Sequence, residues 1–152
     1  MNLLFDTNIL LALIRCKDFE GLINFLNPDN NLIYLSVASE AEIKSIAKRR
    51  NWGTARIEKL DNLLDAVSIV EINHLYINTY VEIDTYSQMS NPDFGPYSFT
   101  TPRNMGKNDL WIASLAGLMG LQLVTTDTDF DHLNELFFQV RRVGVEDLRR
   151  YF

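Results

Sequence analysis

Short apolar runs alternate with longer segments of helical periodicity along this chain, and no other feature constrains its fold as strongly. The apolar runs occupy residues 2–5, 32–35, 67–72, 121–125 and 138–143. Between them, apolar side chains recur at helical spacing, most clearly in residues 54–64 and 107–119. Strands that are separated by helices pair through right-handed crossovers into a parallel sheet. The pattern therefore predicts an α/β fold with about five parallel strands and helices on both faces of the sheet.

Capping residues mark the expected ends of several helices. Ser36 and Asn73 are favourable N-caps for helices that run to about residues 50 and 88, and Gly120 suits the C-cap of the helix at 107–119. Further helices are expected at 9–14, 19–26 and 131–136, with a last helical turn or two from Glu146. The sequence contains no repeat, low-complexity tract or linker, so we expect a single domain over residues 1–152.

The composition is that of a globular domain without a membrane span. Hydrophobic residues make up 47% of the chain, and no apolar run reaches the ~20 residues that a transmembrane helix requires. Cys16 is the only cysteine, so an internal disulfide is excluded and a reducing cytoplasm is the expected location. The net charge of −6 argues against binding of nucleic acid through bulk positive charge. An acidic protein can still act on nucleic acid through a carboxylate-bound metal ion that meets the phosphate.

Five carboxylates lie where this fold predicts a common site. Asp6 follows the first predicted strand, and Asp127 and Asp129 follow the fourth. Ligands bind parallel sheets at the carboxyl ends of the strands, where the strand order reverses. Glu42 and Asp109 lie in predicted helices next to apolar residues. Because gathered and partly buried carboxylates repel one another and lose hydration, a divalent cation such as Mg²⁺ would stabilise this set.

Each of these acids also has an ordinary structural explanation. Asp6 is a suitable N-cap for the helix that follows it, and Asp109 is favourable near the positive end of a helix dipole. Glu42 fits a solvated helix position, and Asp127 and Asp129 fit a turn. The convergence of all five at one predicted edge favours a metal-dependent active site over five separate structural roles.

The acids lie in four stretches: LLFDTNIL at residues 3–10, LSVASEAEI at 35–43, NMGKNDLWIAS at 104–114 and LVTTDTDF at 123–130. In order and spacing these stretches resemble the motifs of the PIN-domain family, in particular the VapC-type toxins of type II toxin–antitoxin systems. The third stretch is the most specific. The resemblance covers essentially the whole chain and implies a three-layer α/β/α domain in which the acids share one cleft.

The resemblance also implies an activity, that of a Mg²⁺- or Mn²⁺-dependent endoribonuclease that cuts RNA with a metal-activated water. Asp6, Glu42 and Asp109 match the first three catalytic acids of the family. Asp127 directly follows its strand and matches the fourth, while in an alternative assignment Asp129 takes or shares that role. The implied metal ligands are Asp6, Asp109, Asp127 and Asp129.

Other polar residues around these motifs are assigned in the same way. Glu42 is preferred to Glu40 because it stands six residues after Ser36, as in the family pattern. Asn8 and Thr125 match polar positions that line such sites, although Asn8 alternatively caps the first helix. Neither histidine is needed for the implied chemistry, and a surface or capping role is expected for His74 and His132.

Residues 90–105 form a long predicted loop that contains three prolines and several aromatic residues. Phe94, Tyr97 and Phe99 either stack on unpaired bases or pack the loop onto the domain, and packing is the favoured interpretation. Arg103 and Lys107 are candidates for phosphate contacts beside the cleft. Arginines near the C-terminus offer either a phosphate track or solvated charge, with solvated charge favoured for at least half of them: Arg141, Arg142, Arg149 and Arg150.

The implied partners are an RNA substrate, a cognate antitoxin protein and a second copy of the chain in a homodimer. Apolar residues of the first two helices are candidates for the antitoxin contact, although core packing explains them equally well: Leu11, Leu13, Phe19 and Leu22. A non-catalytic PIN-like RNA-binding or scaffold protein is the alternative outside enzymes. A haloacid-dehalogenase-type phosphatase is a weaker alternative, because its chemistry needs a second acid two residues after the first, where this chain has Asn8.

Overall fold

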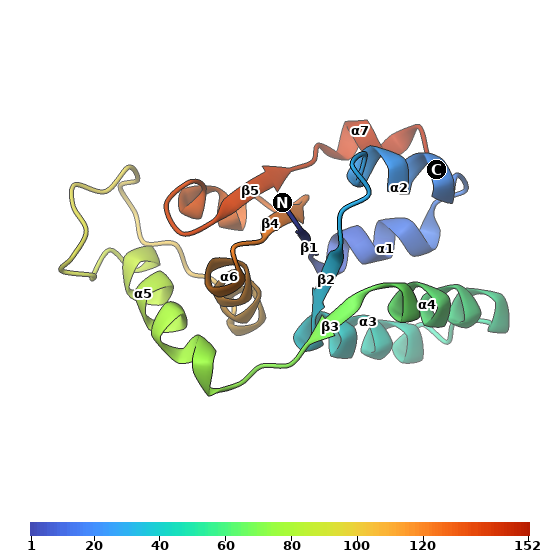
Figure 1. Cartoon of the computed structure of the whole chain (residues 1–152), viewed down its shortest axis with the longest axis horizontal. Coiled ribbons are helices and arrows are strands. Elements are labelled where there is room, and N and C mark those ends of the chain that lie inside the picture. Colours follow the sequence, from blue (N-terminus) through green and yellow to red (C-terminus); the bar gives the residue numbers. More distant parts are fainter.

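Five short parallel strands form the centre of the structure (Figure 1). The computed structural model describes residues 1–152. Its strands are β1 (Leu3–Phe5), β2 (Ile33–Ser36), β3 (Ser68–Val70), β4 (Gln122–Thr125) and β5 (Gln139–Arg142). They lie in the order β3-β2-β1-β4-β5, and every neighbouring pair is parallel. This confirms the predicted α/β fold and its five-stranded parallel sheet.

Helices cover both faces of the sheet, as predicted (Figure 1). One layer contains α1 (Thr7–Arg15), α2 (Phe19–Leu26), α3 (Val37–Arg49), α4 (Thr54–Ala66) and α7 (Val145–Arg149). The other contains α5 (Ile77–Ser87), α6 (Lys107–Met119) and the 3₁₀ turn η2 (Thr128–Leu133), and a shorter 3₁₀ turn, η1 (His74–Tyr76), precedes α5. No helix combines the length and the apolar character that crossing a membrane requires.

The strand β1 separates two hydrophobic cores because its side chains alternate between the faces of the sheet. Leu3 and Phe5 pack into the core shared with α1 to α4, whereas Leu4 packs into the core shared with α5 and α6. All three residues are buried. Burial on both faces explains why this strand is a continuous apolar run in the sequence.

The predicted capping residues lie where helices begin and end. The Ser36 hydroxyl accepts a hydrogen bond from the Ala38 amide at 3.1 Å, and Asn73 accepts one from the Leu75 amide at 2.8 Å. Gly120 ends α6 in the left-handed region at φ 63°, where a side chain would be strained. The short helix predicted at 131–136 is wrong in position. It is replaced by η2, which begins earlier because Asp127 caps it.

Residues 90–105 contain no helix or strand, as expected, and their aromatic side chains pack against Tyr86 of α5. The ring centroids of Phe94, Tyr97 and Phe99 lie 4.9, 5.4 and 5.4 Å from that of Tyr86. The favoured packing interpretation is therefore confirmed. Asn91 anchors the same loop, since its buried side-chain amide donates to Glu82 Oε2 at 3.0 Å.

The C-terminal arginines are engaged within the chain. Arg141 donates to the backbone carbonyls of Leu26 and Phe25 at 2.7 and 2.9 Å, which satisfies the C-terminal end of α2. Exposed ion pairs join Arg142 to Asp131 at 3.2 Å and Arg149 to Glu146 at 3.1 Å, and the Arg150 guanidinium lies 5.0 Å from the Tyr151 ring centroid. The structure therefore favours intramolecular roles over a phosphate track.

The anchoring role of Asn91 predicts that Asn91→Ala loosens the loop at 90–105. Loss of its hydrogen bonds leaves the partly buried Glu82 and Thr85 without a partner, so we expect a loss of about 1–3 kcal/mol in the free energy of unfolding. Limited trypsin digestion should then cut after Arg103 faster than in the wild type. Asn104→Ala is the matched control, because Asn104 is exposed and makes one bond of 3.3 Å to Gln88. Equal digestion rates of Asn91→Ala and the control would contradict the anchoring role.

Candidate metal centre

The order of the strands places the predicted acids at one edge of the sheet. β1 lies between β2 and β4, so the chain reverses its direction of progress across the sheet between β1 and β4. Asp6 directly follows β1, and its amide donates to the Val124 carbonyl of β4 at 3.4 Å. Asp127 follows β4 on the same edge. The ends of these neighbouring strands therefore form the crevice in which parallel sheets bind ligands.

Three of the predicted acids come together at this edge. A carboxylate oxygen from each of Asp109, Asp127 and Asp129 lies within 4.8 Å of the others. Asp109 is supplied by the first turn of α6, and Asp127 caps η2 by accepting a hydrogen bond from the Asp129 amide at 2.9 Å. Asp109 and Asp127 are half-buried, whereas Asp129 is exposed.

Asp6 caps a helix and also faces this cluster. It is 5% exposed, and its Oδ1 accepts from the Ile9 amide at 3.0 Å, which confirms the capping role. Its Oδ2 accepts a hydrogen bond from the Thr125 hydroxyl. Burial, with a smaller contribution from the charge of Asp127, raises the pKa of Asp6 to about 6 despite these hydrogen bonds. Asp6 therefore both caps α1 and interacts electrostatically with Asp127.

Asp109 and Asp129 are also affected by the charges of the neighbouring acids. Burial raises the pKa of Asp109 to about 6, and the charges of Asp127, Asp129, Asp6 and Glu42 add to the effect in that order. The pKa of Asp129 is raised by burial and by Asp127, while the charge of Arg103 lowers it. Because a proton on Asp109 relieves this repulsion below about pH 6, a cation at the same place would relieve it at higher pH.

Glu42 joins the site through a residue that the sequence did not single out. The Thr7 hydroxyl donates to Glu42 Oε2 at 3.0 Å, which ties α3 to the first turn of α1 beside Asp6. Glu40 instead pairs with Lys44 at 2.9 Å. Although Thr7 directly follows Asp6, its bond to a glutamate 35 residues away depends on how α1 packs against α3.

Thr125 links two of the acids, whereas Asn8 plays no capping role. Thr125 is fully buried, donates to Asp6 and accepts from the Asp127 amide at 2.9 Å. Asn8 is exposed in the first turn of α1, because Asp6 already occupies the capping position. Its interpretation as a cap is therefore wrong.

Two basic residues flank the cluster. Arg103 is exposed, its guanidinium lies 5.7 Å from the Phe99 ring centroid, and its charge acts on Asp129. Lys107 is exposed at the first position of α6, two residues before Asp109. Both side chains are therefore available to solvent at the same edge of the sheet.

The expected surface or capping role of His132 is wrong. The ring is buried, and its Nε2 lies 2.7 Å from the Ser87 hydroxyl. Burial and the charge of Arg103 lower the pKa of His132 to about 4, so the ring is neutral at physiological pH. His74, in contrast, lies exposed in η1, as expected.

These residues suit a hard divalent cation. All the donors at the centre are carboxylate oxygens, the ligands that Mg²⁺ and Mn²⁺ prefer, and they are close enough to share one ion. Burial and the charges of neighbouring acids both raise the pKa values of Asp6 and Asp109, so a bound cation would favour their ionised forms. The donor set therefore fits a divalent metal site.

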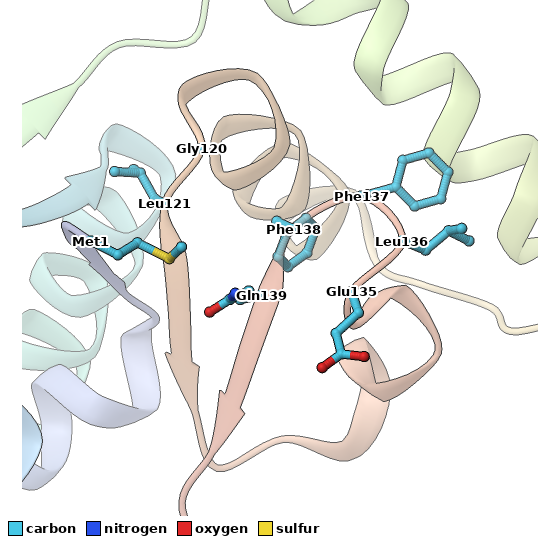
Figure 2. A pocket seen from close by; sticks show the side chains of 8 residues that line it. All are labelled: Met1, Gly120, Leu121, Glu135, Leu136, Phe137, Phe138 and Gln139. Carbon is cyan, nitrogen blue, oxygen red and sulfur yellow. The ribbon is translucent and has the colours of Figure 1, made fainter.

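A hollow lies at the opposite edge of the sheet (Figure 2). Its volume is about 350 Å³, and Met1, Leu121 and Gln139 contribute to it near the beginnings of β1, β4 and β5. Figure 2 shows one acidic side chain there, that of Glu135. Because this hollow lacks a cluster of ligating or nucleophilic groups, it offers no chemistry comparable to that of the acidic edge.

Comparison with known proteins is consistent with this geometry. The family model of the PIN domain matches residues 3–136, and no curated protein matches the sequence. VapBC2 from Rickettsia felis, solved with a DNA fragment of its promoter, is 22% identical with a TM-score of 0.72, and the match covers 93% of this chain and 98% of that chain. VapBC-1 from nontypeable Haemophilus influenzae is 20% identical with a TM-score of 0.70 over the same shares. VapBC-5 from Mycobacterium tuberculosis, of the VapBC family of toxin–antitoxin systems, is 20% identical with a TM-score of 0.63, again over 93% and 98%.

The burial of Asp6 predicts a stability that falls as the pH rises. The pKa of Asp6 is about 6 in the folded protein, whereas in the unfolded chain it has its ordinary value of 3.8. Between these two pKa values the folded state binds more protons than the unfolded state, so the folded state loses stability as the pH rises. The loss is complete above about pH 6, where the buried carboxyl is ionised. We expect Asp6→Asn to stabilise the metal-free protein at about pH 8 by up to about 3 kcal/mol, and to have little effect near pH 4.

Chemical unfolding in the presence of a chelator measures this difference. Asp18→Asn is the control, because Asp18 also caps a helix, α2, but is exposed. The control should show no gain at the higher pH. A wild type as stable as Asp6→Asn at both pH values would contradict the burial penalty.

Proposed function

The chain belongs to the PIN-domain family, and from this premise we propose that it is a metal-dependent endoribonuclease, the toxin of a toxin–antitoxin pair. The observation that carries the proposal is the convergence of Asp109, Asp127 and Asp129 within 4.8 Å, with the buried Asp6 beside them. Such a set is costly to assemble unless it binds a cation, and its position at the strand ends leaves it open to a substrate.

Each acid has a distinct place in the proposed site. Asp6, Asp109 and Asp127 hold the metal, with Asp129 as a further or alternative ligand, and Glu42 positions or deprotonates the attacking water. When bound, Mg²⁺ or Mn²⁺ would polarise this water and offset the charge of the phosphate. Thr125 orients Asp6 and the backbone of Asp127 together. The Thr7 hydroxyl holds the Glu42 carboxylate toward the same edge.

RNA is proposed as the substrate because the site is built for phosphate chemistry and basic groups flank it. Arg103 and Lys107 are exposed at the acidic edge and are proposed to contact the phosphates of the strand. With a net charge of −6, the protein binds nucleic acid through such local contacts and a bound cation rather than through its overall field. We expect products with a 5′-phosphate and a 3′-hydroxyl.

A toxin role is supported by the solved structures whose fold this chain shares. The similar structures from Rickettsia felis, Haemophilus influenzae and Mycobacterium tuberculosis are VapBC proteins, and the last is described as part of a toxin–antitoxin system. We propose that an antitoxin covers α1, α2 and α4. Between α2 and α4 lies a groove of about 310 Å³, whose apolar lining residues are Phe19, Leu63 and Ala66. Leu13 and Leu22 are fully buried, so core packing accounts for them.

A homodimer is proposed as well. Large apolar side chains are exposed on α5 and at the end of α6, and subunit interfaces bury such surface. They are Ile77, Val81, Leu118 and Met119.

Cleavage of RNA by the purified protein tests the proposed activity. Wild type with Mg²⁺ or Mn²⁺ should cut total cellular RNA, and end mapping should find 5′-phosphates. Glu42→Gln should cut at least about a hundredfold more slowly, because a group that handles the proton of the water is lost. Glu40→Gln should cut at the wild-type rate, since Glu40 pairs with Lys44 away from Glu42. Undiminished cutting in excess chelator, or equal loss in both variants, would refute the proposal.

Manganese titration of the folded protein distinguishes the roles of the two acids after β4. Asp127 is half-buried and fixed by its capping bond to η2, whereas Asp129 is exposed. We therefore expect Asp127→Asn to weaken Mn²⁺ binding more than Asp129→Asn, with about 1.4 kcal/mol lost for each tenfold weakening. A larger effect of Asp129→Asn would reverse the assignment of the fourth acid.

A further inference from the structure

A buried polar pair joins the two segments that border the acidic cluster. Ser87 ends α5 and is fully buried, and His132 lies in η2 with 9% of its surface exposed. The distance from Ser87 Oγ to His132 Nε2 is 2.7 Å. The pair therefore connects α5, where the loop at 90–105 departs, to the turn that carries Asp129.

Two aromatic rings flank the histidine of this pair. The His132 ring lies parallel to that of Tyr86, with centroids 6.2 Å apart and an interplanar angle of 5°, and the Phe99 ring meets it nearly at right angles at 5.4 Å. Ser87 Oγ also lies 3.4 Å from Met105 Sδ. If Ser87 donates to this sulfur, it accepts from a proton on His132 Nε2, and only a lone pair on His132 Nδ1 lacks a partner.

The Ser87–His132 hydrogen bond fixes the relative orientation of the segments that pack around it, which apolar contacts alone would fix less specifically. An aromatic residue at position 132 would fill the same space without polar atoms to desolvate, so the histidine is not explained by hydrophobic burial. A hydrogen bond at 2.7 Å fixes the distance and orientation of the two backbones that carry it. The pair is thus suited to holding α5 and η2 in one register.

Arg103 is held between these two segments. Its amide donates to the Ser87 carbonyl at 2.7 Å, and its guanidinium lies over Phe99, which itself packs against His132. Asp129 belongs to η2, and the charge of Arg103 acts on that carboxylate. The position of the guanidinium relative to the acidic cluster therefore depends on how α5 is joined to η2.

We propose that Ser87 and His132 are positioning residues that hold the Arg103 guanidinium beside the acidic cluster, where it binds a backbone phosphate of a single-stranded RNA. This inference rests on the nuclease function proposed above. The acids alone would repel the strand, and a fixed cation at their border offsets that repulsion and sets where the strand lies. The exposed, planar guanidinium suits a phosphate oxygen pair.

The salt dependence of RNA binding tests this arrangement. Fluorescence anisotropy measures binding of a short labelled single-stranded RNA of mixed sequence in Mg²⁺ over a series of KCl concentrations. Every protein carries Glu42→Gln, so that the RNA stays intact. Each lost phosphate contact should reduce the slope of log K against log salt by about 0.7. Arg103→Ala should show this reduction, and so should Ser87→Ala and His132→Phe, in which Arg103 is present but no longer held in place.

Two further proteins separate positioning from general destabilisation. Ser114→Ala removes another buried serine hydroxyl, one that donates to the Leu110 carbonyl at 2.6 Å within α6, and its slope should equal that of the parent. Combining His132→Phe with Arg103→Ala should reduce the slope no further than Arg103→Ala alone, because both changes remove one contact.

Three results would overturn the inference. An unchanged slope in both Ser87→Ala and His132→Phe, with a reduced slope in Arg103→Ala, would refute the positioning role while the nuclease function stands. An unchanged slope in Arg103→Ala would refute the phosphate contact. If the parent binds no RNA and the wild type cuts none, the proposed function fails and this inference fails with it.

Discussion

Repulsion among carboxylates that have lost part of their hydration is the constraint on which the rest of this structure depends. Asp6 and Asp109 both have pKa values raised to about 6, with burial as the largest cause and neighbouring acids as further causes. Native domains are stable by only about 5–15 kcal/mol, so a cluster of this kind requires compensation. This compensation is the basis of our proposal that the cluster binds a divalent cation, which in turn meets a phosphate of the substrate.

The fold brings this cluster about through strand order rather than through local sequence. β1 and β4 are neighbours although more than a hundred residues separate them, so the acids that follow them meet at the switch point. Thr125 then bonds both Asp6 and the Asp127 backbone, while Thr7 draws Glu42 toward the same edge. Two threonines thus set the positions of three acids. The neutral His132 joins η2, which carries Asp129, to Ser87 of α5.

The parts that could be predicted from the sequence follow from short-range physics. Apolar runs, caps such as Ser36 and the places of Asp6 and Asp127 after their strands depend on residues close in the chain. The meeting of Asp109, Asp127 and Asp129 depends in addition on the order of the strands, which the general rules for parallel sheets suggested. The burial of His132 was not predictable, because Tyr86 and Phe99 reach it from α5 and a distant loop. The Thr7–Glu42 bond was missed for the same reason, and η2 was misplaced because the cap formed by Asp127 outweighs periodicity.

Proton release on metal binding tests the central claim most directly, because ligand carboxylates that hold protons must lose them when a cation binds. Calorimetric titration with Mg²⁺ or Mn²⁺ in buffers of different ionisation enthalpy gives the number of protons released. The raised pKa values of Asp6 and Asp109 predict that roughly one proton or more is released per ion at about pH 5.5, and almost none at about pH 8. Absence of binding, or binding without proton release at the lower pH, would contradict the account.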